Sequence, residues 1–233
     1  VFALTRPPGH HVGRYGRAMG APTQGFCIFN NIAGAIYYAL SKKVKPILIL
    51  DIDVHHGNGT QEIFWRNPDV IHIDIHEEGI YPGTGDIKDI GGDEARGTKI
   101  NIPMPPLSQD EDYLYVLREL IIPLIDSIKP RIIVMSAGFD AYQHDGLASM
   151  MLSQEFYYRF GVAIANICKK YRGLLAVLEG GYTTGLRYGL PAFIKGFINY
   201  REVELRDIEI EPTKSVKNRV SEVMKILKSY HSL

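Results

Sequence analysis

The chain has 233 residues, 45% of them hydrophobic and 22% charged, which is the size of one ordinary globular domain with enough apolar side chains for a core. Lys plus Arg and Asp plus Glu each number 26, so the net charge is zero. A neutral chain has no overall field that would attract nucleic acid or an anionic membrane, so any charged partner must be recognised locally.

Along the chain, the first expected element is a short strand over residues 1–5. Four further runs have the length and branched residues of strands buried on both faces, at 46–52, 70–75, 131–136 and 173–178. Helical patterns are expected at about 27–42, 60–66, 109–128, 153–171 and 184–199. Because helices alternate with the buried strands, the sequence predicts an α/β fold with a mostly parallel sheet between two layers of helices.

Helix-end signals accompany two of these segments. Ser108 and Glu111 form an S-x-x-E pattern that predicts a capping box, and Ser153 is expected to cap the helix that follows it. Pro123 is expected to kink or divide the helix over 109–128, because proline lacks the amide hydrogen that a helix interior uses.

The chain turns polar after Ile210 and carries one further helix. Its apolar residues recur at alternating spacings of four and three, namely at Val216, Val220, Val223, Leu227 and Tyr230. This seam spans about two heptads, short of the three or four that argue for a coiled coil. We therefore expect residues 212–233 to pack as a helix on the body of a single domain that covers 1–233.

Polar residues directly follow the buried strands. In an open parallel sheet, ligands bind beyond the carboxyl ends of the strands, where the loops converge. The residues at these ends are Asp51, Asp53, His55, Asp74, His76, Asp140 and the segment 179–182. The sequence therefore predicts one functional site at this edge of the sheet.

The string Asp51-Ile52-Asp53-Val54-His55 projects three possible ligands from one side of an extended strand. Carboxylates that cap the next helix are the ordinary alternative, but several buried and unpaired carboxylates are costly. Catalytic zinc uses three protein ligands and lowers the pKa of its water to about 7. Two carboxylates and one imidazole would make three ligands if a further Asp from a distant segment supplies one of the carboxylates. Asp140, which leaves a buried strand after a glycine, is the best candidate.

Two further segments offer groups for acid–base chemistry. His10 and His11 follow a stiff Pro-Pro-Gly turn that should hold both rings in place. Adjacent loop histidines are often merely exposed, but hydrolysis needs a proton acceptor and a proton donor, which two imidazoles supply. Tyr182 follows two glycines; most tyrosines are packed aromatics, whereas a phenol facing a metal would donate to a developing oxyanion.

These motifs together resemble the zinc-dependent histone deacetylase family, which includes the acetylpolyamine amidohydrolases. The resemblance covers most of the chain, in family order, through RPPGHH at 6–11, GFC-x-x-N-N at 25–31, DIDVHHGNGTQ at 51–61, YPGTGD at 81–86, SAGFDA at 136–141 and LEGGY at 178–182. It implies the arginase/deacetylase fold and zinc-dependent hydrolysis of the acetyl amide of acetyl-lysine or a related acylated amine.

The resemblance also implies which residues bind cations. It assigns Asp53, His55 and Asp140 as ligands of one catalytic zinc ion, although the same ligands do not exclude iron(II). Asp51 would help to bind a structural monovalent cation, expected to be potassium, while also orienting His10.

Catalytic roles follow from the same resemblance. His11 would be the main general base and acid, His10 its positively biased partner, and Tyr182 the electrophilic hydroxyl. Asn58 would orient His11, as in the class II and bacterial branch of the family. A neutral orienter leaves the imidazole less basic than a carboxylate would.

Substrate-binding positions are implied as well. Phe26 and Tyr81 would form the walls of a tunnel for the acyl-lysine stem, and the backbone of Gly25 would receive the substrate amide. Gly180 would let the phenol sit close to the metal. Leu147 stands where the polyamine-selective member of the family has a Glu gatekeeper, which argues against that device.

The chain departs from the family pattern at two places. Gly146 stands where the family usually has proline, so a looser loop over 142–150 is expected. Family members also have a substantial segment ahead of RPPGHH, which supplies a strand and a rim loop. We expect the sequence to be an N-terminally truncated form of such a domain.

Three alternative functions share parts of this pattern. A ureohydrolase such as arginase needs two manganese ions and a D-x-H-x-D string, whereas this chain has D-x-D-x-H. An acetylpolyamine amidohydrolase would act on small acylated amines. A noncatalytic acyl-amine binding protein would keep the pocket without turnover, but every implied ligand and Tyr182 are present.

The cellular setting is predicted from what the sequence lacks. Cys27 and Cys168 are too few for a disulfide framework and favour buried thiols in a reducing cytoplasm. No apolar run approaches the about 18 residues of a membrane span, and no secretory signal is recognised. The expected partner is an acetylated protein or a small acylated amine, and an oligomer is possible.

Overall fold

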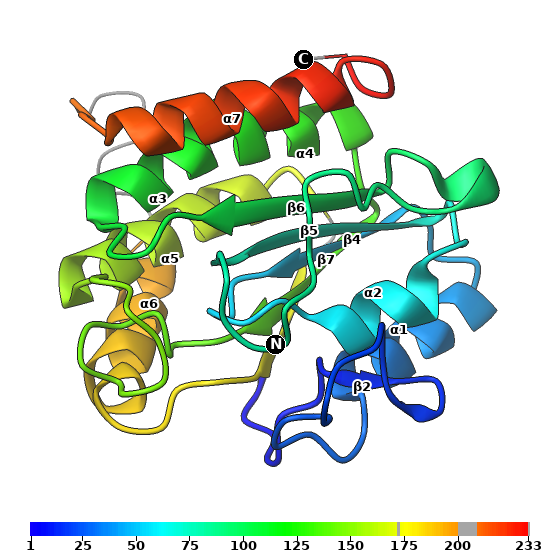
Figure 1. Cartoon of the computed structure of the whole chain (residues 1–233), viewed down its shortest axis with the longest axis horizontal. Coiled ribbons are helices and arrows are strands. Elements are labelled where there is room, and N and C mark those ends of the chain that lie inside the picture. Colours follow the sequence, from blue (N-terminus) through cyan, green and yellow to red (C-terminus); the bar gives the residue numbers. More distant parts are fainter. Residues whose placement is uncertain (172, 200–208, 233) are drawn as a thin grey trace.

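The computed structural model describes residues 1–171, 173–199 and 209–232. Its centre is a six-stranded sheet in the order β1-β8-β7-β4-β5-β6, in which every pair is parallel (Figure 1). The strands are β1 (Phe2–Ala3), β4 (Ile47–Asp51), β5 (Val70–Glu77), β6 (Lys99–Met104), β7 (Ile132–Ala137) and β8 (Leu174–Leu178). A small antiparallel pair, β2 (Val12–Gly13) with β3 (Gly16–Arg17), lies outside this sheet. The predicted α/β fold is confirmed.

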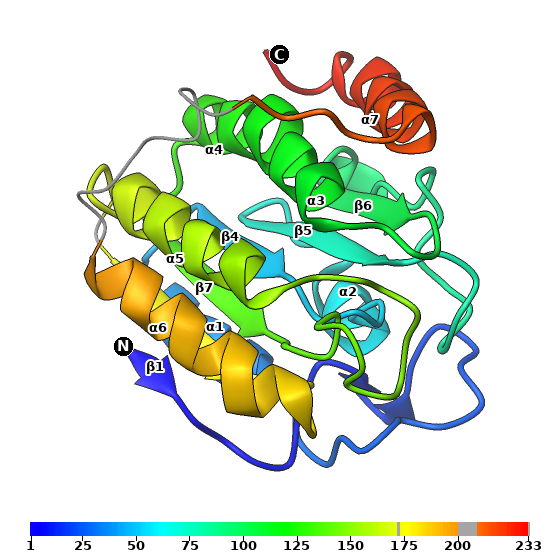
Figure 2. The same cartoon turned by 90° about the vertical axis from the view of Figure 1, so that its left-hand side faces the viewer.

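Helices cover both faces of the sheet. One face carries α1 (Asn31–Ser41) and α2 (Asn58–Phe64), and the other carries α3 (Asp110–Val116), α4 (Ile122–Ile128), α5 (Gln154–Cys168) and α6 (Leu190–Ile198). Figure 2 shows α5 and α6 side by side in front of β7, with α1 behind the sheet. The last helix, α7 (Lys214–Leu227), lies over the β6 edge beside α3 and α4.

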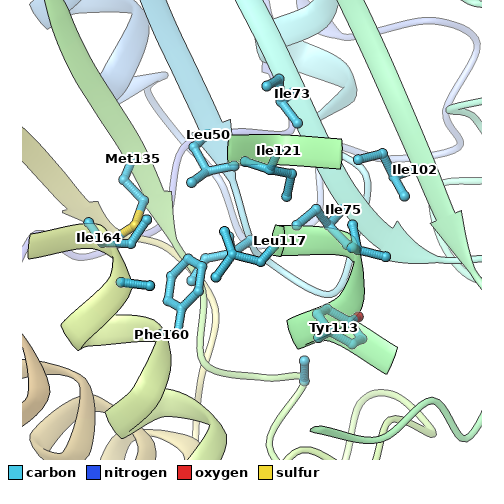
Figure 3. Close-up of a cluster of buried hydrophobic side chains, with 14 of the residues drawn as sticks. Leu50, Ile73, Ile75, Ile102, Tyr113, Leu117, Ile121, Met135, Phe160 and Ile164 are labelled. Carbon is cyan, nitrogen blue, oxygen red and sulfur yellow. The ribbon is translucent and has the colours of Figure 1, made fainter. Parts of the chain in front are cut away.

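The sheet separates two hydrophobic clusters, because successive side chains of a buried strand point to opposite faces. On the α1 side, Ile49 packs with Ile36 and with Phe64 of α2. On the other side, Leu50 belongs to a larger cluster that includes residues of α3 to α7. Figure 3 shows part of this cluster, with Leu50 of the sheet beside Ile121. The central strands are therefore buried on both faces, as their sequences predict.

Strand β6 was missed by the sequence patterns. Its sequence, KINIPM, places Lys99 and Asn101 at alternate positions, which favours a solvent-facing segment, yet all six residues are buried. Lys99 Nζ donates to the carbonyl oxygen of Val70 and to Thr98 Oγ1, both at 2.7 Å. Asn101 Nδ2 donates to Gln61 Oε1 at 2.9 Å. Partners from other segments thus make these polar side chains compatible with an interior position.

The predicted capping box is shifted by one residue. Helix α3 has Gln109 as its N-cap, and the reciprocal bonds join Gln109 and Asp112 instead of Ser108 and Glu111. Ser108 Oγ donates to the carbonyl oxygen of Pro105 at 2.7 Å, which takes this hydroxyl out of the capping position.

Two other helix signals agree with the structure. Ser153 caps α5, since its hydroxyl accepts hydrogen bonds from the amides of Glu155 and Phe156. The segment predicted as one helix over 109–128 is divided by a π-helical turn at Leu117–Ile121, and Pro123 stands at the start of α4.

The polar C-terminal part forms α7 and packs against β6 and α3. Val216, Val220, Val223 and Leu227 are its buried residues. Tyr230 lies beyond the helix end and is 41% exposed, so the apolar seam is shorter than predicted. Among the described residues, no helix combines the length and the apolarity needed to cross a membrane.

Candidate metal centre

The candidate site lies beyond the carboxyl ends of β4, β7 and β8. Strand β4 ends at Asp51, and the following extended segment carries Asp53 and His55. The loop after β7 carries Asp140, and the loop after β8 carries Tyr182. The parallel arrangement of the strands brings these loops to the same edge.

Asp53, His55 and Asp140 form a cluster in which the possible ligand atoms all lie within 4.8 Å of one another. His55 Nδ1 lies 3.1 Å from Asp53 Oδ1 and 3.2 Å from Asp140 Oδ2. Both carboxylates are 1% exposed, whereas the imidazole is 13% exposed. The structure therefore brings together the three predicted ligands, and the cluster is open to solvent on the imidazole side.

Glycines allow the backbones to approach one another closely around this cluster. A Cβ atom at Gly180 would overlap Asp140 Oδ2 and lie 2.5 Å from Asp53 Oδ2. A Cβ atom at Gly138 would overlap the backbone of Asp53. The Gly180 amide also donates to Asp53 Oδ2 at 2.6 Å. Gly180 was predicted to be a substrate-binding residue. Its amide thus also binds the carboxylate of Asp53, a candidate metal ligand.

The electrostatics of the cluster favour a cation. Burial raises the pKa of Asp140 to about 6, and the negative charge of Asp53 adds to this effect. Burial opposes the charged form of His55, but the nearby carboxylates of Asp140 and Asp53 outweigh it and raise the pKa of the imidazole to about 10. Although His55 is 3.2 Å away, Asp140 Oδ2 accepts no well-aligned hydrogen bond from the described residues. Two carboxylates and an imidazole with an unsatisfied oxygen suit a divalent ion such as Zn²⁺ or Fe²⁺.

His10 and His11 lie next to this cluster, with ring centroids 4.1 Å apart. His10 Nδ1 is 3.1 Å from Asp51 Oδ2, and His11 Nδ1 is 2.8 Å from Asn58 Oδ1. His10 Nε2 is also 3.6 Å from Asp53 Oδ1. Each histidine is thus in contact with the residue predicted to orient it, His10 with Asp51 and His11 with Asn58.

The two imidazoles have opposite tendencies to carry a proton. Burial disfavours charge on His10, but Asp53 and Asp51 outweigh it and raise the pKa well above its ordinary value. Burial lowers the pKa of His11 well below its ordinary value, and the neighbouring charge of His10 lowers it further. The pair therefore combines one charged and one neutral ring.

The orientation of Asn58 decides which nitrogen of His11 is free. Asn58 Nδ2 donates to the carbonyl oxygen of Ala18 at 2.9 Å, so its Oδ1 faces His11. His11 Nδ1 must then carry the hydrogen, which leaves Nε2 as the acceptor.

Tyr182 lies at the exposed side of the site, with 38% of its side chain accessible. Arg6 holds its loop from one side: the guanidinium donates to the carbonyl oxygens of Glu179, at 2.7 Å, and of Gly181. The same guanidinium carbon lies 5.0 Å from the centroid of the Tyr182 ring. Arg6 was not predicted to have a role, although its place in RPPGHH was a signal.

Asp145 holds the same loop from the other side and was also missed. Its carboxylate accepts hydrogen bonds from the amides of Tyr182, Thr183 and Gly185 at 2.9, 2.8 and 2.8 Å. Asp145 is 4% exposed. A single Asp in a loop carries no sequence signal for this arrangement.

Aromatic side chains line the approach to the imidazoles. The Tyr81 ring lies 4.9 Å from the His11 ring, and the Phe26 ring lies 5.4 Å from Tyr182 in an edge-to-face arrangement. Gly25 has φ +57°, and a Cβ atom there would lie 2.8 Å from His11 Cδ2. Glycine therefore lets this wall approach the imidazole closely.

The loop over 142–150 is anchored more firmly than its glycine suggested. Gly146 has φ +103°, which proline cannot adopt because its ring holds φ near about −65°. The Ser149 amide donates to Glu77 at 2.8 Å, and Asp145 anchors the loop centre. Leu147 lies on this loop and is 44% exposed.

A second cluster of the same composition lies behind His10. Asp51, His72 and Asp74 have possible ligand atoms within 4.8 Å of one another, and all three are buried. Asp51 and Asp74 are among the strand-end residues that the sequence predicts at the site, whereas His72 was not predicted to have a role.

Known deacetylases resemble this chain in sequence. The sequence model of the histone deacetylase domain matches residues 1–196. A probable deacetylase of Archaeoglobus fulgidus is 42% identical over 206 residues, covering 84% of this chain and 55% of that protein. A histone deacetylase-like amidohydrolase of Pseudomonas aeruginosa is 37% identical over 187 residues, covering 78% of this chain and 48% of that protein.

Similarity extends over nearly the whole chain in two further cases. An uncharacterized protein of Methanocaldococcus jannaschii is 52% identical over 231 residues, covering 98% of this chain and 66% of that protein. The crystal structure of the HDA15 HD domain matches with a TM-score of 0.85 and 33% identity, covering 98% of this chain and 62% of that chain. The chain thus spans between 48% and 66% of the length of the three curated relatives described.

Proposed function

Because the chain belongs to the histone deacetylase family, we propose that it hydrolyses the acetyl amide of acetyl-lysine or of a related acylated amine. Asp53, His55 and Asp140 would hold Zn²⁺, and Fe²⁺ is the alternative that the same ligands accept. The observation that carries the proposal is the position of the buried His10–His11 pair beside this cluster.

The divalent ion would polarise the amide carbonyl and lower the pKa of the attacking water. His11 takes the proton of this water at Nε2, because Nδ1 is engaged with Asn58. Its lowered pKa keeps the ring neutral near pH 7 and able to accept that proton. The same nitrogen then delivers a proton to the leaving amine.

His10 and Tyr182 act on the charge that develops at the carbonyl oxygen. His10 stays positively charged, because Asp53 and Asp51 raise its pKa against the effect of burial. Burial also raises the pKa of Tyr182 above its ordinary value, so its hydroxyl stays protonated and can donate a hydrogen bond to this oxygen.

The approach to the site supports an unbranched acyl-amine substrate. Phe26 and Tyr81 present ring surfaces along the way to His11, and Gly25 leaves room between them. An aromatic slot suits an alkyl stem whose polar amide lies only at its far end. Acetyl-lysine peptides and acetylated polyamines both have this chemistry.

The test is acetate release from an acetyl-lysine peptide by purified protein reloaded with Zn²⁺. We expect a chelator to abolish turnover, readdition of the ion to restore it, and a hydroxamate to inhibit it by occupying the metal. Full activity after verified removal of the metal would overturn the mechanism. Parallel assays with Fe²⁺ under anaerobic conditions decide between the two ions.

A substrate panel separates the substrate classes. Acetyl-lysine peptides and acetylated polyamines are assayed at equal concentration, with binding followed by calorimetry. Preference for the polyamines would replace acetyl-lysine by a small acylated amine as the substrate. Tight binding of every ligand without turnover by the metal-loaded protein would contradict the proposed hydrolysis.

A further inference from the structure

Glu179 is a buried carboxylate that the proposed chemistry does not use. It directly follows strand β8 and is 0% exposed. One carboxylate oxygen, Oε2, accepts hydrogen bonds from two backbone amides, that of Gly9 at 2.6 Å and that of His10 at 3.1 Å. Successive backbone N–H groups can bind one anion together. Glu179 thus joins the loop after β8 to the turn that carries the two imidazoles.

The carboxylate is attached to a fixed point of the sheet. The amide of Glu179 donates to the carbonyl oxygen of Ala137 in β7 at 3.0 Å, which continues the pairing of β8 with β7 by one residue. The guanidinium of Arg6 donates to the carbonyl oxygen of Glu179 at 2.7 Å. A side chain that starts from such a held backbone can define the position of the groups that it binds.

The turn is also held at its other contacts. The carbonyl oxygen of His10 accepts from the amide of Thr60, in α2, at 3.0 Å. A Cβ atom at Gly9 would lie 2.7 Å from the backbone nitrogen of Asn31, where α1 begins, so the turn is packed against that helix. Thr60 therefore binds the carbonyl side of His10, and Glu179 binds its amide side.

The backbone of the turn decides where the imidazoles lie. Each ring is bound at Nδ1, His10 to Asp51 at 3.1 Å and His11 to Asn58 at 2.8 Å, which fixes how the ring is rotated. The reach of each ring toward the metal centre depends on the Cα positions as well, and His10 Nε2 lies 3.6 Å from Asp53 Oδ1. A displacement of about 1 Å can cost about a hundredfold in rate. Loss of the bonds that hold the turn would let both rings shift.

We propose that Glu179 is a positioning residue, whose Oε2 sets the backbone of the Gly9–His10 turn and thereby the place of both imidazoles beside the metal centre. The catalytic consequence rests on the proposed function, because it assumes that the imidazoles transfer protons during hydrolysis. The positioning itself does not, since it concerns only the backbone of the turn. A carboxylate near an imidazole also favours its charged form, so the experiments must separate charge from position.

Two conservative variants make this separation. In Glu179→Gln the amide oxygen can take the place of Oε2 and accept both backbone amides, but the negative charge is lost. The new NH2 group replaces Oε1, which has no hydrogen-bond partner among the described residues, so the acceptor is kept at some cost in stability. In Glu179→Asp the charge is kept, but the side chain is shorter by one methylene, so its oxygen cannot reach the same place without moving the turn.

Steady-state kinetics of the zinc-loaded proteins with an acetyl-lysine peptide compare the two variants. We expect kcat of Glu179→Gln to stay within about threefold of the wild type, and kcat of Glu179→Asp to fall about tenfold or more with little change in KM. Zinc content should be that of the wild type in both variants, because Glu179 is not among the clustered ligands.

Asp112→Asn is the control for the general effect of changing a buried carboxylate. Asp112 is 1% exposed, and it accepts from the amide of Thr213 at 2.7 Å, in the C-terminal part of the chain. The stability of this variant should fall, while kcat per folded protein should stay that of the wild type.

A measurement without substrate tests the position directly. Hydrogen exchange of the Gly9 and His10 amides is followed by NMR in the zinc-loaded wild type, in Glu179→Gln and in Glu179→Met, whose thioether is only a weak acceptor. We expect exchange at these two amides to be about tenfold or more faster in Glu179→Met than in the other two proteins. The amides of β4 are the internal reference, because they report global opening.

Four outcomes would overturn the proposal. An equal fall of kcat in Glu179→Gln and Glu179→Asp, or a fall in Glu179→Gln alone, would show that the charge acts and not the position. Unchanged kcat in both variants would mean that catalysis does not need this oxygen. Unchanged exchange at Gly9 and His10 in Glu179→Met would show that other contacts hold the turn.

The two measurements do not depend on each other. If Glu179→Met does not fold, the kinetic comparison of Glu179→Gln with Glu179→Asp still decides. If the wild type has no turnover with any substrate, the deacetylase proposal fails, whereas the exchange measurement still decides whether Glu179 holds the turn.

Discussion

The carboxylate of Asp145 accepts a hydrogen bond from the backbone amide of Tyr182 at 2.9 Å. The same carboxylate binds the amides of Thr183 and Gly185, so one buried anion organises the turn that carries the phenol. The geometry makes Asp145 a positioning residue, since it fixes the backbone of Tyr182 and does not face the substrate path itself.

Replacement of Asp145 by Asn should loosen this turn. The amide group of Asn would place an N–H donor against the amide of Tyr182 or Thr183, and at least one buried donor would lose its acceptor. Each such loss costs about 1–3 kcal/mol. We expect kcat to fall about tenfold or more with a small change in KM, because the tyrosine hydroxyl is used mainly as charge develops.

The control for this change is Asp112→Asn. Asp112 is equally buried, and its carboxylate accepts from the backbone amide of Thr213 at 2.7 Å, far along the chain from the site. Both variants should lose stability, but only Asp145→Asn should lose kcat beyond the loss of folded protein. Equal losses of kcat would reduce Asp145 to a general structural role.

Tyr182→Phe tests the phenol directly. The hydroxyl is the group that would donate to the carbonyl oxygen, and loss of one such donor lowers kcat about a hundredfold or more. Zinc content should stay that of the wild type, because Tyr182 is not among the clustered ligands. Steady-state assays with metal analysis check both points, and unchanged turnover would remove Tyr182 from this role.

Asn58→Asp should change the pH dependence of activity. A carboxylate beside His11 Nδ1 favours the imidazolium, so the pKa of His11 rises toward its ordinary value. The base must be neutral, and the acid limb of kcat/KM should therefore move to higher pH. The new carboxylate would also face the carbonyl oxygen of Ala18, so stability should fall. If the acid limb of the kcat/KM profile stays at the same pH, it reports the titration of a group other than His11.

Gly180→Ala should release the metal of the first cluster. The added Cβ atom would overlap Asp140 Oδ2 and displace a ligand oxygen. We expect zinc affinity to fall about tenfold or more, measured by competition with a chelator. Gly34→Ala, in the open interior of α1, is the control and should raise stability by up to about 1 kcal/mol without loss of zinc.

Lys99 should make stability depend on pH in the alkaline range. Burial lowers its pKa to about 7 from the usual 10.5. Between these values the unfolded state binds a proton at Lys99 that the folded state does not, so the contribution of Lys99 to the free energy of unfolding rises with pH, by at most about 1.4 kcal/mol per unit. This contribution should be absent in Lys99→Met and persist in Lys225→Met, an exposed control on α7.

Urea unfolding at pH 7, 8 and 9 measures this effect. The stability of the wild type relative to Lys99→Met should increase at each step. A constant difference would mean that Lys99 stays protonated, held by its bonds to the carbonyl oxygen of Val70 and the Thr98 hydroxyl.

Much of the fold was predictable because it depends on local patterns. Strands β4, β7 and β8 are mainly apolar runs, which predict strands buried on both faces, and β5 was predicted from its branched residues Val70, Ile71 and Ile73. Strand β6 was not predicted, since Lys99 and Asn101 become acceptable in the interior only through partners such as Val70 and Gln61. The shifted cap of α3 has a similar cause, because Ser108 bonds to Pro105 instead.

The sequence by itself determined the types of ligand and their place at the strand ends. Asp53 and His55 project together because an extended chain alternates its side chains, and Asp140 follows another strand of the same parallel sheet. Only the tertiary structure decided that Asp145 anchors Tyr182 and that His72 meets Asp51 and Asp74. These contacts join residues from separate loops and strands, and such pairs leave no periodicity or spacing along a single chain.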